Sequence, residues 1–333
     1  MIGCGASSFS QQGPALKRYE ALHEGAEIVA CCDIDEERAK AFKDAFQIPH
    51  CFTDIETMLD EINPQAVCLN IPSGGIVAPA CLILEKGFPL ILQKPPGAAA
   101  EDTLRIIQAA KSNIARTAFN RRYMPLVQKL TSILDETQIM DISYRMLRVQ
   151  RFGADFTGMA VCGIDLVRFI AKADYKQLDI RYKILARYAE NVANYYLNGE
   201  MRSGAVVRLD FLPVSGMEAE RLEINTHKGL FILELPIPDS GDCGRLVHME
   251  NKKPVYSVRG DELTGSEKSE EYILSGCYEA NARFFDDVKN GKKDQNIESG
   301  LQPVDILSHL KRKVMQYNLM PNARPAFPAL DQE

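Results

Sequence analysis

The chain has 333 residues, a length that predicts two domains, because a single hydrophobic core seldom grows beyond about 250–300 residues. Its formal net charge of −6 argues against direct binding to nucleic acid, which requires a basic surface. The sequence shows neither an apolar run of about 18 residues nor a basic leader followed by a hydrophobic region, so we expect a cytoplasmic protein without membrane contact.

In residues 1–118, short apolar runs alternate with helical patterns. The runs at 27–32, 66–71 and 89–92 are continuous, which is typical of parallel strands buried on both faces. Amphipathic stretches lie between and around them, at 13–22, 36–46, 55–61, 78–86 and 101–111. Strands that alternate with helices of this length predict βαβ units and a parallel sheet. We therefore interpret residues 1–118 as a Rossmann-type dinucleotide-binding domain.

The hexapeptide Gly-Cys-Gly-Ala-Ser-Ser lies where the first strand should turn into the first helix. Gly3 allows the tight turn, and Gly5 lets the backbone approach a pyrophosphate at the helix N-terminus. Ser8 stands in place of a third glycine and is still small enough for close packing. Together with Ala6 and Ser7, these residues are predicted to bind the phosphates of the cofactor.

Only Met1 and Ile2 precede this loop, which leaves the first strand nearly absent. A strand in a globular protein normally has about five residues. The sequence leaves open whether native residues precede Met1.

Asp33 stands directly after the second strand. A carboxylate at this position can accept both hydroxyls of an adenosine ribose, and it repels a 2′-phosphate. The next arginine along the chain is Arg38, so no phosphate clamp is expected beside it. NAD is therefore favoured over NADP; the alternative is that Asp33 is an ordinary solvated acid at a strand end.

The nine cysteines lie mostly inside apolar segments, as Cys31, Cys32, Cys68 and Cys81 do. No CxxC pair occurs, and the histidines are not clustered at metal-ligand spacing. Free, buried thiols in a reducing compartment explain this pattern better than disulfides or a bound metal.

Residues 119–333 show longer strand patterns, several with alternating faces. These patterns fall at 139–151, 180–188, 199–211, 220–226 and 230–235, with helices near 157–172 and 278–290. They predict an α+β domain with a large, mostly antiparallel sheet and helices on one face. The open face predicts a homodimer or homotetramer. The polar stretch 236–276 is either a functional arm or a mobile loop.

A recognisable pattern occurs at Leu-Gln-Lys-Pro-Pro, residues 92–96. A strand end followed by Glu-Lys-Pro marks the glucose–fructose oxidoreductase, inositol dehydrogenase and rhizopine catabolism (Gfo/Idh/MocA) family, which this sequence resembles from end to end. Further matching stretches lie at 71–72, 119–123, 157–169, 203–205 and 284–291. The resemblance implies NAD(P)-dependent hydride transfer at a carbinol carbon of a sugar, inositol or related polyol.

The resemblance also implies roles for individual residues. Lys94 is expected to reach both nicotinamide and substrate, where an ammonium stabilises a developing alkoxide or shuttles its proton. Gln93 replaces the acid expected to bind the nicotinamide ribose, and its amide can still bond the ribose hydroxyls. Ile71 and Pro72 complete the expected cofactor site. The alternative is that Lys94 is a surface lysine at a strand end.

The helix that opens the second domain departs from the family pattern. Many members carry Asp-x-x-x-His there, three residues before a second Asp; this sequence has Gly158, Cys162 and Asp165 at these positions. A thiol with a pKa near about 8.5 is a poor proton acceptor compared with a histidine near about 6.5. Cys162 is a catalytic and substrate-binding candidate if Lys94 or the helix N-terminus lowers that pKa; otherwise it is a small apolar filler.

The remaining candidates carry less weight. Asn120, Arg122 and Tyr123 follow the crossover into the second domain and are candidates for substrate binding. Arg122 and its neighbour Arg121 can equally form ion pairs between the domains. Outside the family motifs, the arginines at 145, 148 and 151 are expected at solvent or oligomer contacts, and Asp165 is expected to orient its helix. Of the five scattered histidines, the one at 248 is the most interesting, because it lies in the polar stretch.

The sequence therefore predicts an NAD-dependent sugar or polyol oxidoreductase with a small polar substrate. Two alternatives remain. One is a non-catalytic NAD-binding sensor or regulatory protein, favoured by the departures at Gln93, Gly158 and Cys162. The other is elimination or hydrolysis with NAD recycled in place. The sequence leaves the substrate and the direction of reaction open.

Overall fold

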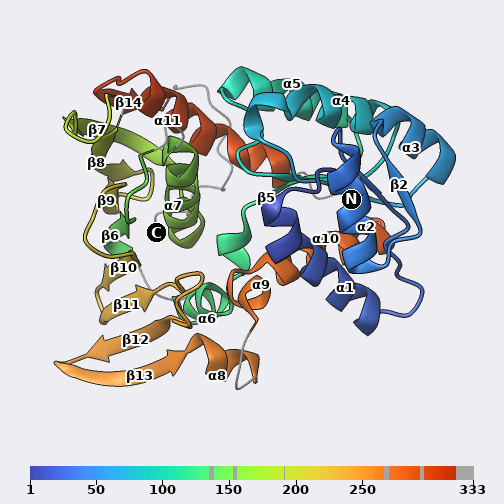
Figure 1. Cartoon of the computed structure of the whole chain (residues 1–333). Helices are drawn as coiled ribbons and strands as arrows, with labels where there is room; N and C mark the ends of the chain where they lie inside the picture. The colour runs from blue at the N-terminus through green and yellow to red at the C-terminus, as the bar shows by residue number, and fades with distance from the viewer. Residues whose placement is uncertain (135–138, 153–155, 191, 266–269, 293–295, 320–333) are drawn as a thin grey trace. The chain divides into compact units, whose positions relative to one another are not determined.

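The structure of the protein is a computed structural model that describes residues 1–134, 139–152, 156–190, 192–265, 270–292 and 296–319 (Figure 1). The chain forms two compact units. The first unit consists of Met1–Tyr123 and Glu270–Val304, and the second consists of Met124–Ser269 and Asp305–Glu333. The first unit thus contains a C-terminal segment that a continuous division at residue 118 assigns to the second domain.

The first unit contains a parallel sheet. Its strands are β1 (Ala30–Cys32), β2 (His50–Phe52), β3 (Val67–Leu69), β4 (Leu90–Gln93) and β5 (Ala115–Ala118). β1 pairs with β2, and β3, β4 and β5 pair in that order. Ile2 joins the two groups, because it bridges in parallel to Cys32 on one side and to Leu69 on the other. The order β2–β1–Ile2–β3–β4–β5 is that of a Rossmann sheet and confirms the predicted βαβ units.

Helices connect these strands. They are α1 (Gly13–Leu22), α2 (Glu36–Phe46), α3 (Ile55–Ile62), α4 (Val77–Glu85) and α5 (Ala100–Ala110). The predicted helices at 13–22 and 36–46 are confirmed at both ends. The first helix already begins at Ala6, and its segment η1 (Ser8–Gln12) is π-helical. Asp35 caps α2, since its carboxylate accepts hydrogen bonds from the N–H groups of Glu37 and Arg38.

Helix α10 (Cys277–Lys289), which follows the second unit's strands in the chain, packs against the first sheet. Phe284 shares a buried cluster with Leu16, Cys68 and Ile91. Arg116 of β5, only 2% exposed, donates to Asp287 of α10 at 2.7 Å. These contacts explain why residues 270–304 belong to the first unit. The short elements α9 (Glu271–Leu274), η3 (Asn120–Tyr123) and η4 (Asn296–Gly300) belong to the same unit.

The second unit is built on a nine-stranded sheet of order β13–β12–β11–β10–β6–β9–β8–β7–β14. Its strands are β6 (Ile139–Leu147), β7 (Tyr175–Ile184), β8 (Ala193–Met201), β9 (Val206–Leu212), β10 (Ala219–Thr226), β11 (Leu230–Glu234), β12 (Arg245–Glu250), β13 (Lys253–Arg259) and β14 (Gln316–Asn318). The neighbours are antiparallel, apart from β6 and β9, which are parallel. The predicted large, mostly antiparallel sheet is confirmed.

Helices cover one face of this sheet. α7 (Phe156–Ala171) lies against β6 and β9, as Figure 1 shows, and α6 (Pro125–Leu134) packs near β12. α11 (Leu301–Lys311) begins in the first unit and adds Ile306 and Leu310 to the core of the second. On the strands, alternate side chains point the other way and are exposed, as in β7. The sheet therefore has a covered face and an open face, as the alternating patterns predict.

The polar stretch 236–276 is not a mobile loop over most of its length. It contains β12, β13 and α8 (Gly260–Thr264), and residues 266–269 within it lie outside the described residues. Leu246 and Val258 pair across the hairpin and are buried, and this apolar contact is what orders the segment.

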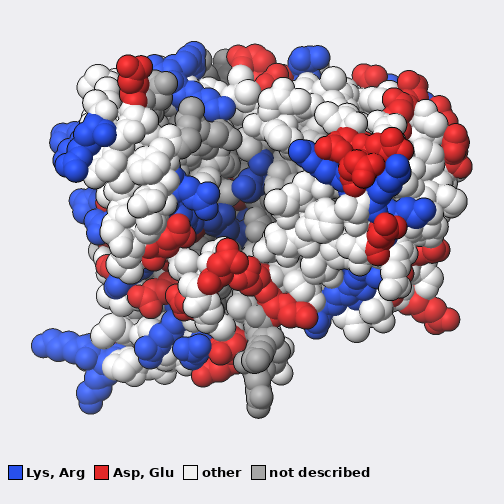
Figure 2. Space-filling model, in the orientation of Figure 1, with Lys and Arg blue, Asp and Glu red and all other residues white. Residues whose placement is uncertain are grey.

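Figure 2 shows basic and acidic side chains interspersed over the visible face of the protein. Among the described residues, no helix combines the length and apolar character needed to cross a bilayer. Nor do the described side chains include a group of three or more potential metal ligands.

Candidate functional site

The strands of the first unit are parallel, so their carboxyl ends lie at one edge of the sheet, which we call the carboxyl edge. Gly3 follows Ile2 there, Asp33 follows β1, Asn70 follows β3 and Lys94 follows β4. The strand order reverses at Ile2, which has β1 on one side and β3 on the other. In open α/β sheets, ligands bind outside the carboxyl ends at such a switch point.

The glycine-rich loop begins this edge. Gly3 has a φ of 88°, and a Cβ on it would lie 2.2 Å from the carbonyl oxygen of Asn70, so only glycine fits. At Gly5 a Cβ would meet no heavy atom within 4 Å, so the space beside its backbone is open. Ala6 and Ser7 are exposed at the start of the first helix, where N–H groups have no intrahelical acceptor. This combination is suited to bind a phosphate.

Ser8 has a structural task in this loop. Its side chain is fully buried, its hydroxyl donates to the carbonyl oxygen of Gly3 at 2.5 Å, and it accepts from Nδ2 of Asn70 at 2.7 Å. Ser8 thus fixes the loop to β3 instead of replacing a glycine passively. The sequence analysis missed Asn70; its signal is a polar residue directly after a buried strand.

Ile71 and Pro72 lie beside the same loop. A Cβ on Gly3 would come within 2.8 Å of Cγ2 of Ile71, so this side chain packs against the loop. Pro72 is exposed and precedes the short helix η2 (Ser73–Gly75). Both residues are therefore at the carboxyl edge.

Asp33 is half-buried and holds the loop in place. Oδ2 accepts from the backbone N–H of Cys4 at 2.7 Å, and Oδ1 accepts from the N–H of Asp35 at 3.0 Å. An ionised carboxylate offers about four lone-pair sites, so capacity remains for ribose hydroxyls. The guanidinium of Arg38 lies 3.2 Å from the carboxylate of Asp35. Arg38 is therefore paired with an acid, and this pairing opposes its use as a clamp for a 2′-phosphate.

Lys94 is half-buried at the end of β4, and the peptide bond between Lys94 and Pro95 is cis. The side-chain carbonyl of Gln93 accepts from the backbone N–H of Lys94 at 3.1 Å. Within the part of the chain that the structure describes, the ammonium of Lys94 forms neither an ion pair nor a hydrogen bond. A half-buried cation without a protein partner is available to a ligand.

The residues after β5 are held by the first unit itself. Nδ2 of Asn120 donates to the carbonyl oxygen of Ser275 at 2.8 Å. Arg122 is 5% exposed, donates to the hydroxyl of Ser299 at 3.0 Å and stacks over Phe119. These contacts give Arg122 a structural task independent of any ligand. The ring of the next residue, Tyr123, lies below the guanidinium of Arg283, 5.5 Å from its centroid.

In the second unit, Cys162 is the seventh residue of α7 and is 4% exposed. This position lies in the second turn of α7, beyond the first turn in which the field of a helix terminus mainly acts. The neighbouring Gly163 lies against Tyr144: a Cβ there would be 2.2 Å from the ring. This close approach brings α7 onto β6 beside Cys162.

Beneath this contact lies a buried charged network. The hydroxyl of Tyr144 donates to Oε1 of Glu220 at 2.6 Å, and Oε2 of Glu220 pairs with Arg148. Arg148 is 5% exposed and also donates to the carbonyl oxygen of Leu147 at 2.9 Å. The expectation that Arg148 serves solvent or oligomer contacts is therefore wrong, because the guanidinium faces the helix-covered side of the sheet.

Three further candidates of the second unit are Arg145, Asp165 and His248. Arg145 is exposed and pairs with Asp210 at 3.1 Å, and Asp165 is 1% exposed, which fits a structural role. His248 of β12 stacks on Phe231 of β11 with ring centroids 4.0 Å apart, so its ring packs against the neighbouring strand.

All nine cysteines are free. Burial raises the pKa of Cys32 and of Cys68 to about 11, so both thiols stay protonated at neutral pH. Buried thiols that remain protonated behave as small apolar residues, as the sequence predicts.

The carboxyl edge fits a dinucleotide. It offers an open glycine backbone at a helix start for phosphates, a carboxylate for a ribose and, at the end of β4, a lysine ammonium that has no partner among the described residues. The first unit is thus a dinucleotide-binding domain of the Rossmann type. Residues 1–120 match the model of the GFO_IDH_MocA family, described as "Oxidoreductase family, NAD-binding Rossmann fold". The resemblance found in the sequence is confirmed over these residues, and the cofactor of this domain is NAD.

Curated relatives are inositol 2-dehydrogenases. That of Salmonella typhimurium is 27% identical over 128 residues, which are 37% of this chain and 38% of the relative. That of Burkholderia cenocepacia is 24% identical over 203 residues, 57% of this chain and 58% of the relative. The chain thus matches about two fifths to three fifths of the length of these relatives.

Solved structures match nearly the whole chain. An oxidoreductase domain protein from Kribbella flavida superposes with a TM-score of 0.81 at 14% identity, over 96% of this chain and 98% of that one. Levoglucosan dehydrogenase in complex with NADH and levoglucosan has a TM-score of 0.79 at 16% identity, over 95% and 97%. An Agrobacterium radiobacter oxidoreductase in complex with NAD⁺, L-tartaric acid and magnesium has a TM-score of 0.78 at 16% identity. The match covers 95% of this chain and 96% of that one. These likenesses establish the fold.

Proposed function

We propose that the protein is an NAD-dependent oxidoreductase that transfers a hydride between nicotinamide and a carbinol carbon of a sugar, inositol or related polyol. The observation that carries the proposal is the half-buried ammonium of Lys94, unpaired within the described residues and located at the same sheet edge as the glycine loop and Asp33. The matched relatives, inositol and levoglucosan dehydrogenases, support a polyhydroxylated substrate.

Different residues of the carboxyl edge would bind different parts of the cofactor. The backbone at Gly3, Gly5, Ala6 and Ser7 would hold the pyrophosphate. Asp33 would accept the adenosine ribose hydroxyls and exclude a 2′-phosphate, which favours NAD over NADP. Ser8 holds the loop in shape. Ile71, Pro72 and Gln93 line the edge, and the amide of Gln93 would bind the nicotinamide ribose.

Bound NAD supplies a nicotinamide ring that takes up or gives back a hydride. Lys94 would hold the substrate hydroxyl through its ammonium and stabilise the negative charge that grows on that oxygen as the hydride leaves carbon. Cys162, as its thiolate, would take the proton and become a thiol, in place of the histidine found in many members, with Asn120 and Tyr123 as further substrate contacts. The proton must go to such an acceptor or to water.

A screen of sugars, inositols and other polyols for NADH formation tests the proposal. We expect at least one polyol to reduce NAD in a reaction that depends on both protein and substrate. NADH binding without turnover of any polyol would contradict the enzyme and favour the second candidate, a non-catalytic NAD-binding sensor. The replacement of Asp and His by Gly158 and Cys162 is what supports that candidate.

We also propose that the protein forms a homodimer or homotetramer through the open face of the nine-stranded sheet, and that it is cytoplasmic, where free thiols persist. The open face carries compensated charges: Arg145 pairs with Asp210, and Arg221 pairs with Glu223 and Glu234. Light scattering of the purified protein measures the subunit number; a monomer would contradict the proposal.

A further inference from the structure

Charge is distributed unevenly along the carboxyl edge of the first sheet. Asp33 and Asp35 follow β1. The segments that follow β3, β4 and β5 contain no acidic residue and three basic ones, Lys94 among them; they are residues 70–75, 93–98 and 118–123. The strand of Ile2 and β3 lie between β1 and β4. At about 4.8 Å per strand, the acids of β1 are about 14 Å from the end of β4, so they do not compensate the lysine closely.

The side chains at the end of β4 offer hydrogen-bond donors to a ligand. The side-chain carbonyl of Gln93 accepts from the backbone N–H of Lys94 at 3.1 Å. Because a backbone N–H only donates, the amide oxygen must face it, and the two N–H bonds of Nε2 are left over. One of them suffices for the nicotinamide ribose. The ammonium of Lys94 adds three donors, and none of these has an acceptor within the described residues.

One acid from a distant segment comes near this part of the edge. Segment η4 passes beside Pro96, since a Cβ on Gly300 would lie 3.1 Å from Cγ of that proline. The acid of η4, Glu298, is exposed and forms no ion pair with Lys94. The positive charge at the end of β4 is therefore uncompensated in the part of the chain that the structure describes.

The end of β5 provides the complementary kind of group. β5 pairs with β4, with Ala118 opposite Gln93, and Asn120 follows two residues later. Nδ2 of Asn120 donates to the carbonyl oxygen of Ser275 at 2.8 Å. A carbonyl only accepts, so this bond fixes the orientation of the amide and leaves Oδ1 as an acceptor without a partner among the described residues. The edge thus offers donors after β4 and an acceptor after β5.

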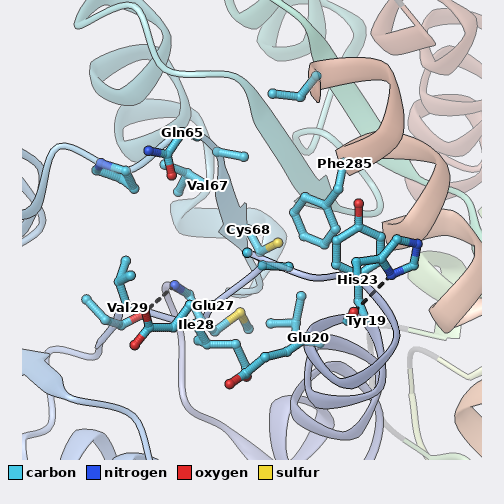
Figure 3. A pocket seen from close by; sticks show the side chains of 18 of the residues that line it. Tyr19, Glu20, His23, Glu27, Ile28, Val29, Gln65, Val67, Cys68 and Phe285 are labelled. Carbon is cyan, nitrogen blue, oxygen red and sulfur yellow. Dashed lines mark hydrogen bonds between the residues drawn. The ribbon is translucent and has the colours of Figure 1, made fainter. Parts of the chain in front are cut away.

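The opposite end of the sheet has a different character. A cavity of about 490 Å³ lies among the residues that lead into β1 and β3, and Figure 3 shows Glu20 and Glu27 on its wall. Glu24 and one lysine, Lys289, also line it, and most of the remaining wall is apolar. Since the carboxylates of this wall repel an anion, an anionic ligand is favoured at the carboxyl edge and not in this cavity.

We propose that the substrate is a sugar acid, in which a carboxylate stands on the carbon next to the reacting carbinol; this inference rests on the proposed function and narrows its substrate class. A carboxylate accepts up to about four hydrogen bonds and donates none, so it matches the donors of Gln93 and Lys94. A neutral polyol would place a hydroxyl there, whose own proton finds no acceptor after β4. Because an ammonium has three N–H bonds, Lys94 can bind the carboxylate and the neighbouring hydroxyl together. A further hydroxyl of the sugar chain can donate to Oδ1 of Asn120.

The carboxylate takes no part in bond breaking. The C–H bond of the carbinol carbon breaks and its hydride passes to NAD⁺, while the hydroxyl proton goes to the thiolate of Cys162 or to water. A carbon–oxygen double bond forms at the same carbon. A 2-hydroxy sugar acid and NAD⁺ thus give a 2-keto acid, NADH and one proton.

The test measures binding to the NADH complex of the full chain by calorimetry, so that no turnover occurs. The ligands are matched pairs that differ only at C1, which is a carboxylate in one and a CH₂OH group in the other: D-gluconate and D-glucitol, D-galactonate and D-galactitol, D-mannonate and D-mannitol. We expect the acid of at least one pair to bind at least about tenfold more tightly than its alcohol at low ionic strength. Salt at about 0.5 M should weaken binding of the acid by at least about threefold and leave that of the alcohol unchanged.

Two variants test whether Lys94 carries the effect. Lys94→Gln keeps N–H donors but loses the charge, so it should bring the affinities for acid and alcohol within about threefold of each other. Lys86→Gln is the matched control and should keep the native ratio, since Nζ of Lys86 pairs with Asp60 and Glu56. A native ratio in Lys94→Gln would contradict the role of this ammonium.

Equal binding of acid and alcohol in every pair would overturn the proposal, and so would the failure of all these compounds to bind. NADH formation from NAD⁺ and the same compounds separates this result from the proposed function. If the alcohols are oxidised with the same kcat/KM as the acids, the oxidoreductase stands and the sugar acid is wrong. If the acids bind preferentially but no compound is oxidised, the anion site stands and the oxidoreductase is wrong.

Discussion

The backbone N–H of Cys4 donates a 2.7 Å hydrogen bond to Oδ2 of Asp33, which fastens the glycine-rich loop to the end of β1. Asp33 accepts a second bond from the N–H of Asp35. A single carboxylate therefore sets the shape of the loop before any ligand arrives and is expected to bind the ribose afterwards. These two tasks can be separated by substitution, because an amide keeps the acceptor but loses the charge.

Asp33 is expected to determine the choice of cofactor. We predict that the native protein binds NADH at least about tenfold (~1.4 kcal/mol) more tightly than NADPH, because the carboxylate repels the 2′-phosphate. Asp33→Asn should bring the two affinities within about threefold while leaving the unfolding temperature nearly unchanged. Energy transfer from tyrosine to the bound NADH or NADPH measures the two affinities, since the chain has no tryptophan. Equal affinities in the native protein would disprove the assignment.

The two glycines of the loop are expected to respond differently to a methyl group. Gly3→Ala must strain a φ of 88° and meet the carbonyl oxygen of Asn70, so it should lower the free energy of unfolding by about 2–4 kcal/mol. Gly5→Ala meets no neighbour, so it should keep native stability but weaken NADH binding by about tenfold or more. Urea unfolding and NADH titration of both variants provide the comparison. A Gly5→Ala protein that binds NADH normally would show that no phosphate approaches this backbone.

Lys94→Ala is expected to lower kcat on an active polyol by about 10²–10³-fold, comparable to the loss of one charge-stabilising donor. NADH affinity should change by less than about threefold, because the loop and Asp33 are intact. Lys86→Ala is a suitable control: Nζ of Lys86 pairs with Asp60 and Glu56, and its loss should leave kcat unchanged. Normal turnover by Lys94→Ala would mean that this lysine is structural.

Cys162 distinguishes the enzyme from the sensor. If its thiol transfers the proton, Cys162→Ser should lose at least about 10²-fold in activity, because a hydroxyl does not ionise near neutral pH. Cys162→His should keep or raise the rate by restoring the residue common in the family. NADH formation on the native protein and both variants is the measurement. Full activity of Cys162→Ser would exclude thiol catalysis, and activity found only in Cys162→His would identify a scaffold that has lost its catalyst.

The buried pair of Arg148 and Glu220 is expected to stabilise the second unit. Arg148→Met leaves the carboxylate of Glu220 buried without its partner, which should cost about 3–5 kcal/mol in the free energy of unfolding. The double variant Arg148→Met/Glu220→Gln should recover at least about half of this loss, since it removes the uncompensated charge. Urea unfolding measures both. Additive losses in the double variant would contradict a direct coupling between the two side chains.

Local patterns in the sequence predicted most of the elements. The continuous apolar runs and amphipathic stretches placed the helices at 13–22 and 36–46 correctly, because burial on one face imposes a period that is visible in a single chain. The strand predicted at 27–32 begins only at Ala30. Its first residues join no strand ladder within the described residues, and pairing between strands is not a property of the local sequence.

Contacts between distant residues escaped prediction. From the sequence, Arg148 is predicted to be a surface residue at a strand end. It is buried because its guanidinium pairs with Glu220, which is distant in the sequence. The bond from Asn70 to Ser8 spans 62 residues, and no local pattern indicates it. Likewise, the sequence offered no sign of the π-helical turn at Ser8–Gln12, where Gln12 accepts from Asn281 of α10 at 2.8 Å. The glycine-rich loop and Lys94 could be predicted, because each motif consists of residues that are adjacent in the sequence.

The place of α10 in the first unit also concerns how the protein is made. A ribosome releases the chain in order, so residues 124–269 must all be synthesised before Cys277, the first residue of α10, exists. Until then, the apolar side chains of Leu16, Cys68 and Ile91 lack Phe284, which shares their cluster. They can therefore be bound by chaperones or by other nascent chains. Translation that stops before Cys277 would leave a fragment whose core cannot close, a substrate for proteolysis rather than a small NAD-binding protein.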